Sequence, residues 1–164
     1  MKRITWCVLC CLVAAPTVAG ELTKDFRWGS PGLQSVGPLS FGPEGILFVA
    51  DTRGAAIVAI DTGDEPSRGA RAPFKVEALD KKIAAMVGSS GREILINDMV
   101  VNPQSGNAYV AASRGGGPDA SPILLRVEKS GKITIVSLDK VKFSRAEIPD
   151  PPPAGVQGTG RRRR

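Results

Sequence analysis

Two stretches of this chain, residues 37–51 and 97–112, follow the same pattern. In each, a short apolar segment is followed by a proline, then a glycine two or three positions later, then an apolar run. Such self-similarity indicates that the chain is built from repeated supersecondary units. Each unit has the pattern of a strand, a Pro/Gly turn and further strands, which favours a propeller-type blade over a helical repeat. The matched positions are Pro43 with Pro103 and Gly45 with Gly106.

Residues 1–19 have the three parts of a secretory signal peptide. A basic start is followed by an apolar stretch from Ile4 to Ala15 and by small residues ending at Ala19. The apolar stretch is too short for a bilayer core of about 30 Å, so an anchoring transmembrane helix is the weaker alternative. We expect an exported protein, periplasmic or extracellular, with no membrane span after the leader is removed. The three cysteines, Cys7, Cys10 and Cys11, leave with that leader.

The positive net charge does not predict a nucleic-acid partner. Of the 22 basic residues, two lie in the leader and four are Arg161 to Arg164 at the end of the chain. The remaining 16 equal the 16 acidic residues, so the expected folded body is formally neutral. A nucleic-acid-binding domain should instead carry a basic patch on its folded surface.

The pattern of apolar runs and turn residues predicts an all-β fold of two four-stranded antiparallel units. Pro38 confines the first of these strands to the edge or end of a sheet, because proline cannot donate to a strand ladder. The expected strands cover residues 35–41, 46–51, 55–61 and 74–79 in the first unit, and 96–102, 108–113, 123–129 and 133–138 in the second.

The expected division of the chain follows these units. After the signal peptide come an entry segment (20–34), the first blade (35–80), a connecting segment (81–95), the second blade (96–148) and a disordered Pro/Gly/Arg tail (149–164). Ile83, Met86 and Val87 have helical spacing, which predicts one short connecting helix. The glycine-rich loop 114–122 lacks the Gly-Lys-Ser/Thr of a phosphate-binding loop and is expected to be a loop at the mouth of the fold.

The segment 37–61 resembles the blades of six-bladed propellers of the NHL and gluconolactonase/regucalcin type. The resemblance lies in Phe-Val-Ala-Asp at 48–51, the glycine turn, and Ile-Val-Ala-Ile-Asp at 57–61. Residues 96–110 look like a second such blade. The resemblance implies blades arranged around a channel, with a small molecule or a protein bound at one mouth. Two blades are fewer than a closed propeller needs, so we expect either the amino-terminal part of a propeller or self-association.

The same resemblance suggests a metal site. In the lactonase branch a glutamate that binds a divalent cation stands just before the Gly-Pro of the first blade, and here that position is Val36. Asp98 and Asn97 supply two hard oxygen donors on an expected inner strand, which would suit a divalent cation such as calcium or magnesium. The other interpretation of Asp98 is a turn or a hydrogen bond between blades. Asp51 and Asp61, at strand ends, are expected to stabilise turns.

The chain contains no histidine, which excludes Ser-His-Asp catalysis and imidazole metal sites. The catalytic residues, if there are any, are unknown from the sequence. Trp28 is expected to pack over a blade end, the alternative being stacking on a sugar. We therefore expect an exported propeller-type domain that acts in binding or scaffolding. The alternative is a secreted metal-dependent lactone hydrolase whose remaining ligands lie in further blades.

Overall fold

The computed structural model describes residues 22–66 and 75–152, so the expected signal peptide and most of the expected tail lie outside the described residues. The described part is mostly β-structure, with one α-helix and three short 3-10 turns. The elements are β1 (Arg27–Gly29), β2 (Leu39–Phe41), η1 (Pro43–Gly45), β3 (Ile46–Asp51), β4 (Ala56–Asp61), α1 (Leu79–Met86), η2 (Gly91–Glu93), β5 (Ile94–Val101), β6 (Ala108–Arg114), η3 (Gly117–Asp119), β7 (Ser121–Val127), β8 (Ile133–Ile135) and β9 (Val141–Glu147).

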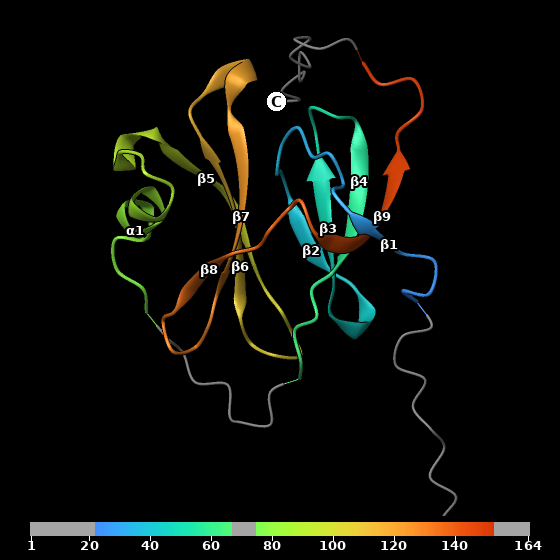
Figure 1. Cartoon of the computed structure of the whole chain (residues 1–164), viewed down its shortest axis with the longest axis horizontal. Coiled ribbons are helices and arrows are strands. Elements are labelled where there is room, and N and C mark those ends of the chain that lie inside the picture. Colours follow the sequence, from blue (N-terminus) through green and yellow to red (C-terminus); the bar gives the residue numbers. More distant parts are fainter. Residues whose placement is uncertain (1–21, 67–74, 153–164) are drawn as a thin grey trace, which may run out of the picture.

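These strands form two antiparallel sheets, which lie side by side in Figure 1. The first sheet has five strands in the order β1-β9-β4-β3-β2, and the second has four in the order β5-β6-β7-β8. The expected all-β fold is therefore confirmed at the level of two antiparallel sheets. The strand that contains Leu39 lies at an edge of its sheet, as Pro38 predicts.

The two copies of the sequence repeat occupy corresponding places in the two sheets. In the first copy β2 and β3 pair around the turn at Pro43, and in the second β5 and β6 pair around the turn at Pro103. The glycine that ends each turn has a positive φ, +72° at Gly45 and +77° at Gly106. A glycine is favoured there because other residues rarely adopt this conformation. The repeat thus encodes a strand, a turn and a strand.

The first sheet is completed differently from the sequence expectation. Residues 75–78 form no strand and α1 begins at Leu79, so the expected strand at 74–79 is wrong for its described residues, while Phe74 lies outside them. The place beside β4 is taken by β9, from the far end of the described chain. The entry segment also contributes, because β1 pairs with β9. Alternation in 74–77 indicated a strand, but the apolar side chains of this segment, Val76 and Leu79, pack under the second sheet.

The main core lies between the two sheets. Strands alternate their side chains between two faces, so every second residue of β3, β4, β6, β7 and β9 points into this interface. The buried members of this core are Val36, Leu39, Leu47, Val49, Val58, Ile60, Tyr109, Ala111, Leu124, Val141 and Phe143.

A second core lies on the outer face of the second sheet, where α1 covers it (Figure 1). The expected connecting helix is thus present and buries Ile83 and Ala84. Their neighbours on the sheet are Ile94, Ala108, Val110, Ala112, Ile123, Leu125 and Val127. No helix in the described part of the chain is long and apolar enough to cross a membrane.

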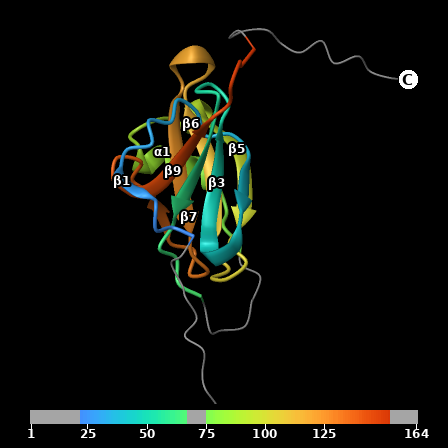
Figure 2. The same cartoon turned by 90° about the vertical axis from the view of Figure 1, so that its right-hand side faces the viewer.

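The outer face of the first sheet has no such cover among the described residues. Figure 2 shows this side of the molecule, with β1, β3 and β9 toward the viewer. Phe48 and Ile57 point outward there and are 37% and 39% exposed. They line a shallow apolar groove of about 330 Å³ together with Leu22 and Phe26 from the entry segment.

Candidate functional site

Asp98 and Asn97, the predicted metal ligands, lie on β5 at a bulge in its pairing with β6. Asp98 Oδ2 accepts a hydrogen bond of 2.7 Å from the backbone N–H of Leu39 on β2. Its Oδ1 accepts one of 2.8 Å from the backbone N–H of Met99. Asn97 Nδ2 donates to the carbonyl oxygen of Val36 at 3.0 Å. The two side chains therefore join the inner edges of the two sheets.

Asp98 thus has a structural role: its carboxylate accepts a hydrogen bond from the other sheet. A hydrogen bond between the two repeated units was the second interpretation of Asp98 from the sequence. A cation at Asp98 would have to compete with two amide N–H groups for the carboxylate oxygens. In the described residues, no three His, Cys, Asp or Glu side chains gather in a way that could hold a metal ion. The calcium site at Asp98 and Asn97 stays a prediction, and it competes with this structural role.

Asp51, at the end of β3, is fully buried and joins three parts of the first sheet. Its carboxylate accepts hydrogen bonds from the backbone N–H groups of Gln34 at 3.1 Å, Ser35 at 2.9 Å and Gly54 at 2.9 Å. Arg145 of β9 forms an ion pair with it at 3.3 Å. The expected role in the β3–β4 turn is present in the bond from Gly54, but the carboxylate also holds the entry segment and β9.

The pKa of Asp51 lies below the usual value of 3.8. Burial acts to raise this pKa, but the hydrogen bonds from the backbone N–H groups of Gln34, Gly54 and Ser35 stabilise the charged form and outweigh burial. Asp51 is therefore ionised in the folded protein at neutral pH. Its role is to stabilise the fold.

A second buried carboxylate, Asp64, was not singled out by the sequence. It follows β4 and accepts hydrogen bonds from Asn102 Nδ2 at 3.1 Å, from Asn107 Nδ2 at 2.9 Å and from Ser105 Oγ. All three donors belong to the turn between β5 and β6, in the second copy of the repeat. The residue types Asn, Ser and Asn around Gly106 were visible in the sequence, but their acceptor in the other sheet was not.

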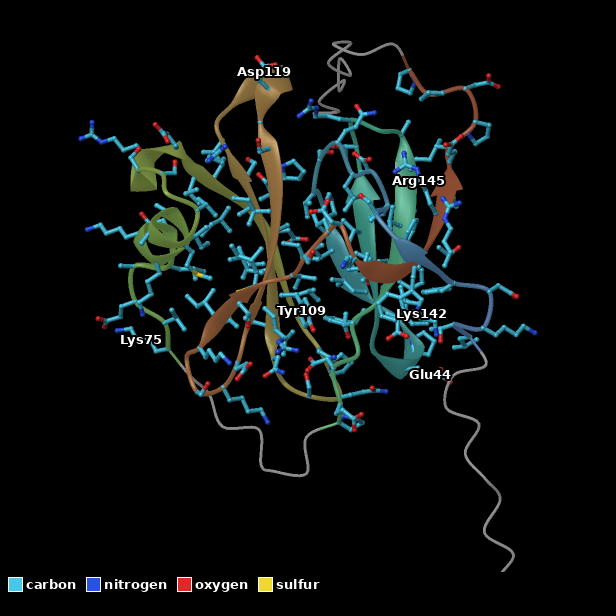
Figure 3. The ribbon with its side chains drawn as sticks, in the orientation of Figure 1. Glu44, Lys75, Tyr109, Asp119, Lys142 and Arg145 are labelled. Carbon is cyan, nitrogen blue, oxygen red and sulfur yellow. The ribbon has the colours of Figure 1, made fainter. Side chains whose placement is uncertain are left out.

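A cleft of about 420 Å³ opens between the sheets where the chain crosses from β8 to β9. Tyr109, Arg126 and Thr134 line it from three neighbouring strands of the second sheet. Figure 3 shows Tyr109 between the two sheets. Burial raises the pKa of the Tyr109 hydroxyl, so this group is neutral and can act as a hydrogen-bond donor. We call this site the Arg126 cleft.

The glycine-rich loop borders a different cleft of about 350 Å³. Gly115, Gly116 and Gly117 line it together with Arg53 and Asn97. Arg53 crosses it, because its NH1 donates to the carbonyl oxygen of Ala120 at 3.1 Å. Asn97 is thus beside a cleft, but its amide nitrogen donates to the carbonyl oxygen of Val36.

Trp28 does not pack over a sheet end as expected. It lies on β1 opposite Lys142 of β9, and 75% of its surface is exposed. Its neighbour Arg27 turns the other way, with its guanidinium 4.9 Å from the ring centre of Phe143. The alternation of the short strand therefore places the cation against Phe143, whereas Trp28 on the other face is exposed and lines the Arg126 cleft.

Comparison with models of known protein families, with curated proteins and with solved structures gave no match. A function for this chain is therefore inferred from its own surfaces and clefts.

Proposed function

We propose that this chain is an exported binding domain of the β-propeller type, whose two sheets correspond to two blades. Three features support the proposal: the strand-turn-strand repeat, the antiparallel pairing in chain order of β2 to β4 and of β5 to β8, and the contact between β2 and β5 through Asp98. In propellers the first strand of each blade lies nearest the channel, and we assign β2 and β5 to that position. We propose that the protein acts by contact with a partner.

The observation that carries this proposal is the surface of β5. This eight-residue strand is the last of its sheet on one side. Four of its apolar side chains, Leu95, Ile96, Met99 and Val101, are between 46% and 59% exposed. Soluble proteins rarely leave several large apolar side chains of one strand in water unless the strand is a contact surface. We therefore place the binding surface on β5.

The partner that this surface fits best is another β-structured protein surface, and a second copy of this chain is the simplest case. The folded body is formally neutral, so apolar contact rather than opposite charge should drive the association. In a homodimer the same β5 surface would be used by both copies, as two-fold symmetry requires.

Sedimentation velocity over a range of protein concentrations tests this proposal. We expect a concentration-dependent dimer, and we expect Met99→Glu to shift it to monomer because a charge would be buried in the contact. Ile135→Glu is the matched control, since Ile135 is 44% exposed on β8, at the opposite edge of the second sheet from β5. A wild-type chain that stays monomeric at all concentrations, or a dimer equally weakened by both substitutions, would contradict the proposed β5 contact.

A further inference from the structure

Two buried side-chain atoms in the described part of the chain lack a hydrogen-bond partner, Arg126 Nε and Thr134 Oγ1. Buried polar groups in folded proteins nearly always have a partner, so each exception calls for an explanation. Both residues line the Arg126 cleft. Two independent exceptions in one cleft point to a ligand that supplies the missing partner.

The two residues are direct neighbours across the sheet. Arg126 of β7 pairs with Thr134 of β8 on one side and with Tyr109 of β6 on the other. Residues directly opposite each other in a sheet have their Cβ atoms about 5 Å apart and on the same face. Tyr109 belongs to the core between the sheets, so this row of three polar side chains faces the first sheet.

The other nitrogens of Arg126 already have acidic partners. NH2 is 3.2 Å from Glu128 Oε1, and NH1 is 3.9 Å from Asp64 Oδ1. At the rim of the cleft, Lys142 forms an ion pair with Asp61 at 3.6 Å, and Lys140 also lines the cleft. Two cations of the cleft, Arg126 and Lys142, are thus already paired with carboxylates. An anionic ligand would compete with these carboxylates, whereas an uncharged one would not.

The cleft otherwise has an apolar lining. Ile60 and Val141 contribute to it from the first sheet, and Val136 contributes from the β8–β9 connection. Small-molecule sites typically combine such an apolar lining with a few polar groups that orient the ligand. Arg126 Nε–H can only donate, and the Thr134 hydroxyl can also donate. One oxygen atom with two lone pairs can accept from both.

We propose that the Arg126 cleft binds a small uncharged molecule with a mainly apolar body and one accepting oxygen, held by Arg126 Nε–H and the Thr134 hydroxyl. The oxygen can be that of a carbonyl or of an alcohol, since both accept two hydrogen bonds. This site is separate from the exposed surface of β5. A failure of the dimer experiment therefore leaves it untouched, and the reverse also holds.

Titration of the isotope-labelled purified chain with two neutral probes, acetophenone and 1-phenylethanol, tests the proposal by NMR. For molecules of this size we expect dissociation constants of about 1 mM. The amide signals of Arg126 and Thr134 should shift with either probe, and the stronger probe identifies the kind of oxygen. Benzoate, which has a similar ring but a charge, should bind at least about tenfold more weakly, as a charge without a partner is costly to bury.

Substitutions at the two orphaned groups separate a ligand site from a structural role. Thr134→Val removes the side-chain hydroxyl, and Arg126→Lys removes the Nε–H. Each substitution should weaken acetophenone binding about tenfold. Thr134→Ser keeps the hydroxyl and should restore binding. Ser130→Ala, on the same β7–β8 hairpin but outside the cleft, is the control and should change nothing. Thr134→Val should not lower the melting temperature, because it removes a buried group without a partner.

The proposal is wrong if neither neutral probe shifts these signals at 10 mM, about ten times the expected dissociation constant. It is also wrong if benzoate binds more tightly than both probes, which would indicate an anion site. A Thr134→Val protein that binds as well as wild type but melts at a lower temperature would likewise overturn it. That result would show that water alone satisfies the hydroxyl.

Discussion

The second sheet is built almost entirely from neighbouring parts of the chain, whereas the first sheet depends on distant ones. Strands β5 to β8 pair in chain order, and α1, which comes just before them, covers their outer face. In the first sheet β2 to β4 also pair in order, but β9 must return to lie between β4 and β1. The repeat thus specifies one pair of adjacent strands in each sheet, β2 with β3 and β5 with β6. Pairing in chain order completes the second sheet, whereas long-range pairing with β9 completes the first.

The largest loss of stability should come from a substitution in the β3–β4 turn, where Gly54 donates to the buried carboxylate of Asp51. A Cβ on Gly54 would lie 2.1 Å from Asp51 Oδ2, so Gly54→Ala must displace the carboxylate from Arg145 and its amide donors. We expect the free energy of unfolding to fall by about 3 kcal/mol or more, as when a buried ion pair is broken. Urea unfolding measures this.

The control for that substitution lies in the glycine-rich loop of the second sheet. Gly116 has an extended backbone, and a Cβ there would meet no atom within 4 Å. Gly116→Ala should therefore change the free energy of unfolding by less than about 0.5 kcal/mol. If the two substitutions cost the same, the Asp51 cluster does not have the role assigned to it.

The two outer faces should respond differently to the loss of an apolar side chain. Ile83→Ala removes a fully buried side chain between α1 and the second sheet and should cost about 2–4 kcal/mol. Ile57→Ala removes one that is 39% exposed on the open face of the first sheet and should cost less than about 1 kcal/mol. Thermal unfolding of both variants measures the difference. A large loss for Ile57→Ala would mean that something covers that face in solution.

Acid should weaken the first sheet through Asp51. Because the pKa of Asp51 is lower in the folded protein than its usual value of 3.8, the folded state binds fewer protons than the unfolded state in that range. The stabilisation is therefore complete above this value and is lost as the pH falls through the lower folded pKa. Asp51→Asn should be less stable at neutral pH and should lose less stability on acidification. The free energy of unfolding measured from pH 7 to pH 2 tests this, and parallel curves for the two proteins would contradict it.

The smallest loss of stability should come from removing the hydrogen bond between Asp98 and Leu39, which links the two sheets. Asp98→Asn weakens the acceptor of the Leu39 N–H and should cost about 1 kcal/mol. Calcium should leave the melting temperature of both proteins unchanged, because both oxygens of Asp98 already accept amide N–H groups. A calcium-dependent rise that Asp98→Asn abolishes and Asp51→Asn keeps would contradict this expectation and would favour the metal-dependent hydrolase.

The sequence predicted what depends on local pattern. Pro43 and Pro103 with their following glycines marked the two equivalent turns, and the spacing of Ile83, Met86 and Val87 marked the helix, because turns and helix faces are encoded within a few residues. The alternation at 74–77 was misleading, since a helix start and a half-exposed strand can share a short apolar pattern. Nothing near Val141 indicated that β9 would pair with β4, because that pairing joins residues far apart in sequence.

The candidate sites show the same limit. Asp98 was chosen for its place on an expected inner strand. It lies on β5, and its hydrogen-bond partner Leu39 lies in the other sheet. Asp64 and Arg126 look like ordinary surface charges in the sequence. Both are at least partly buried because the two sheets pack against each other, and no local sequence pattern encodes that packing.

The most direct test of this account is a disulfide across the β4–β9 pair. Ala59 and Ser144 lie directly opposite each other in that pairing. In a chain with Cys7, Cys10 and Cys11 changed to serine, Ala59→Cys with Ser144→Cys should oxidise readily to a cross-linked monomer. The matched pair Ala59→Cys with Val76→Cys should stay reduced, because Val76 packs with α1 against the other sheet. A cross-link in the second pair and none in the first would mean that residues around Val76, rather than β9, pair with β4. That result would contradict the pairing of β4 with β9.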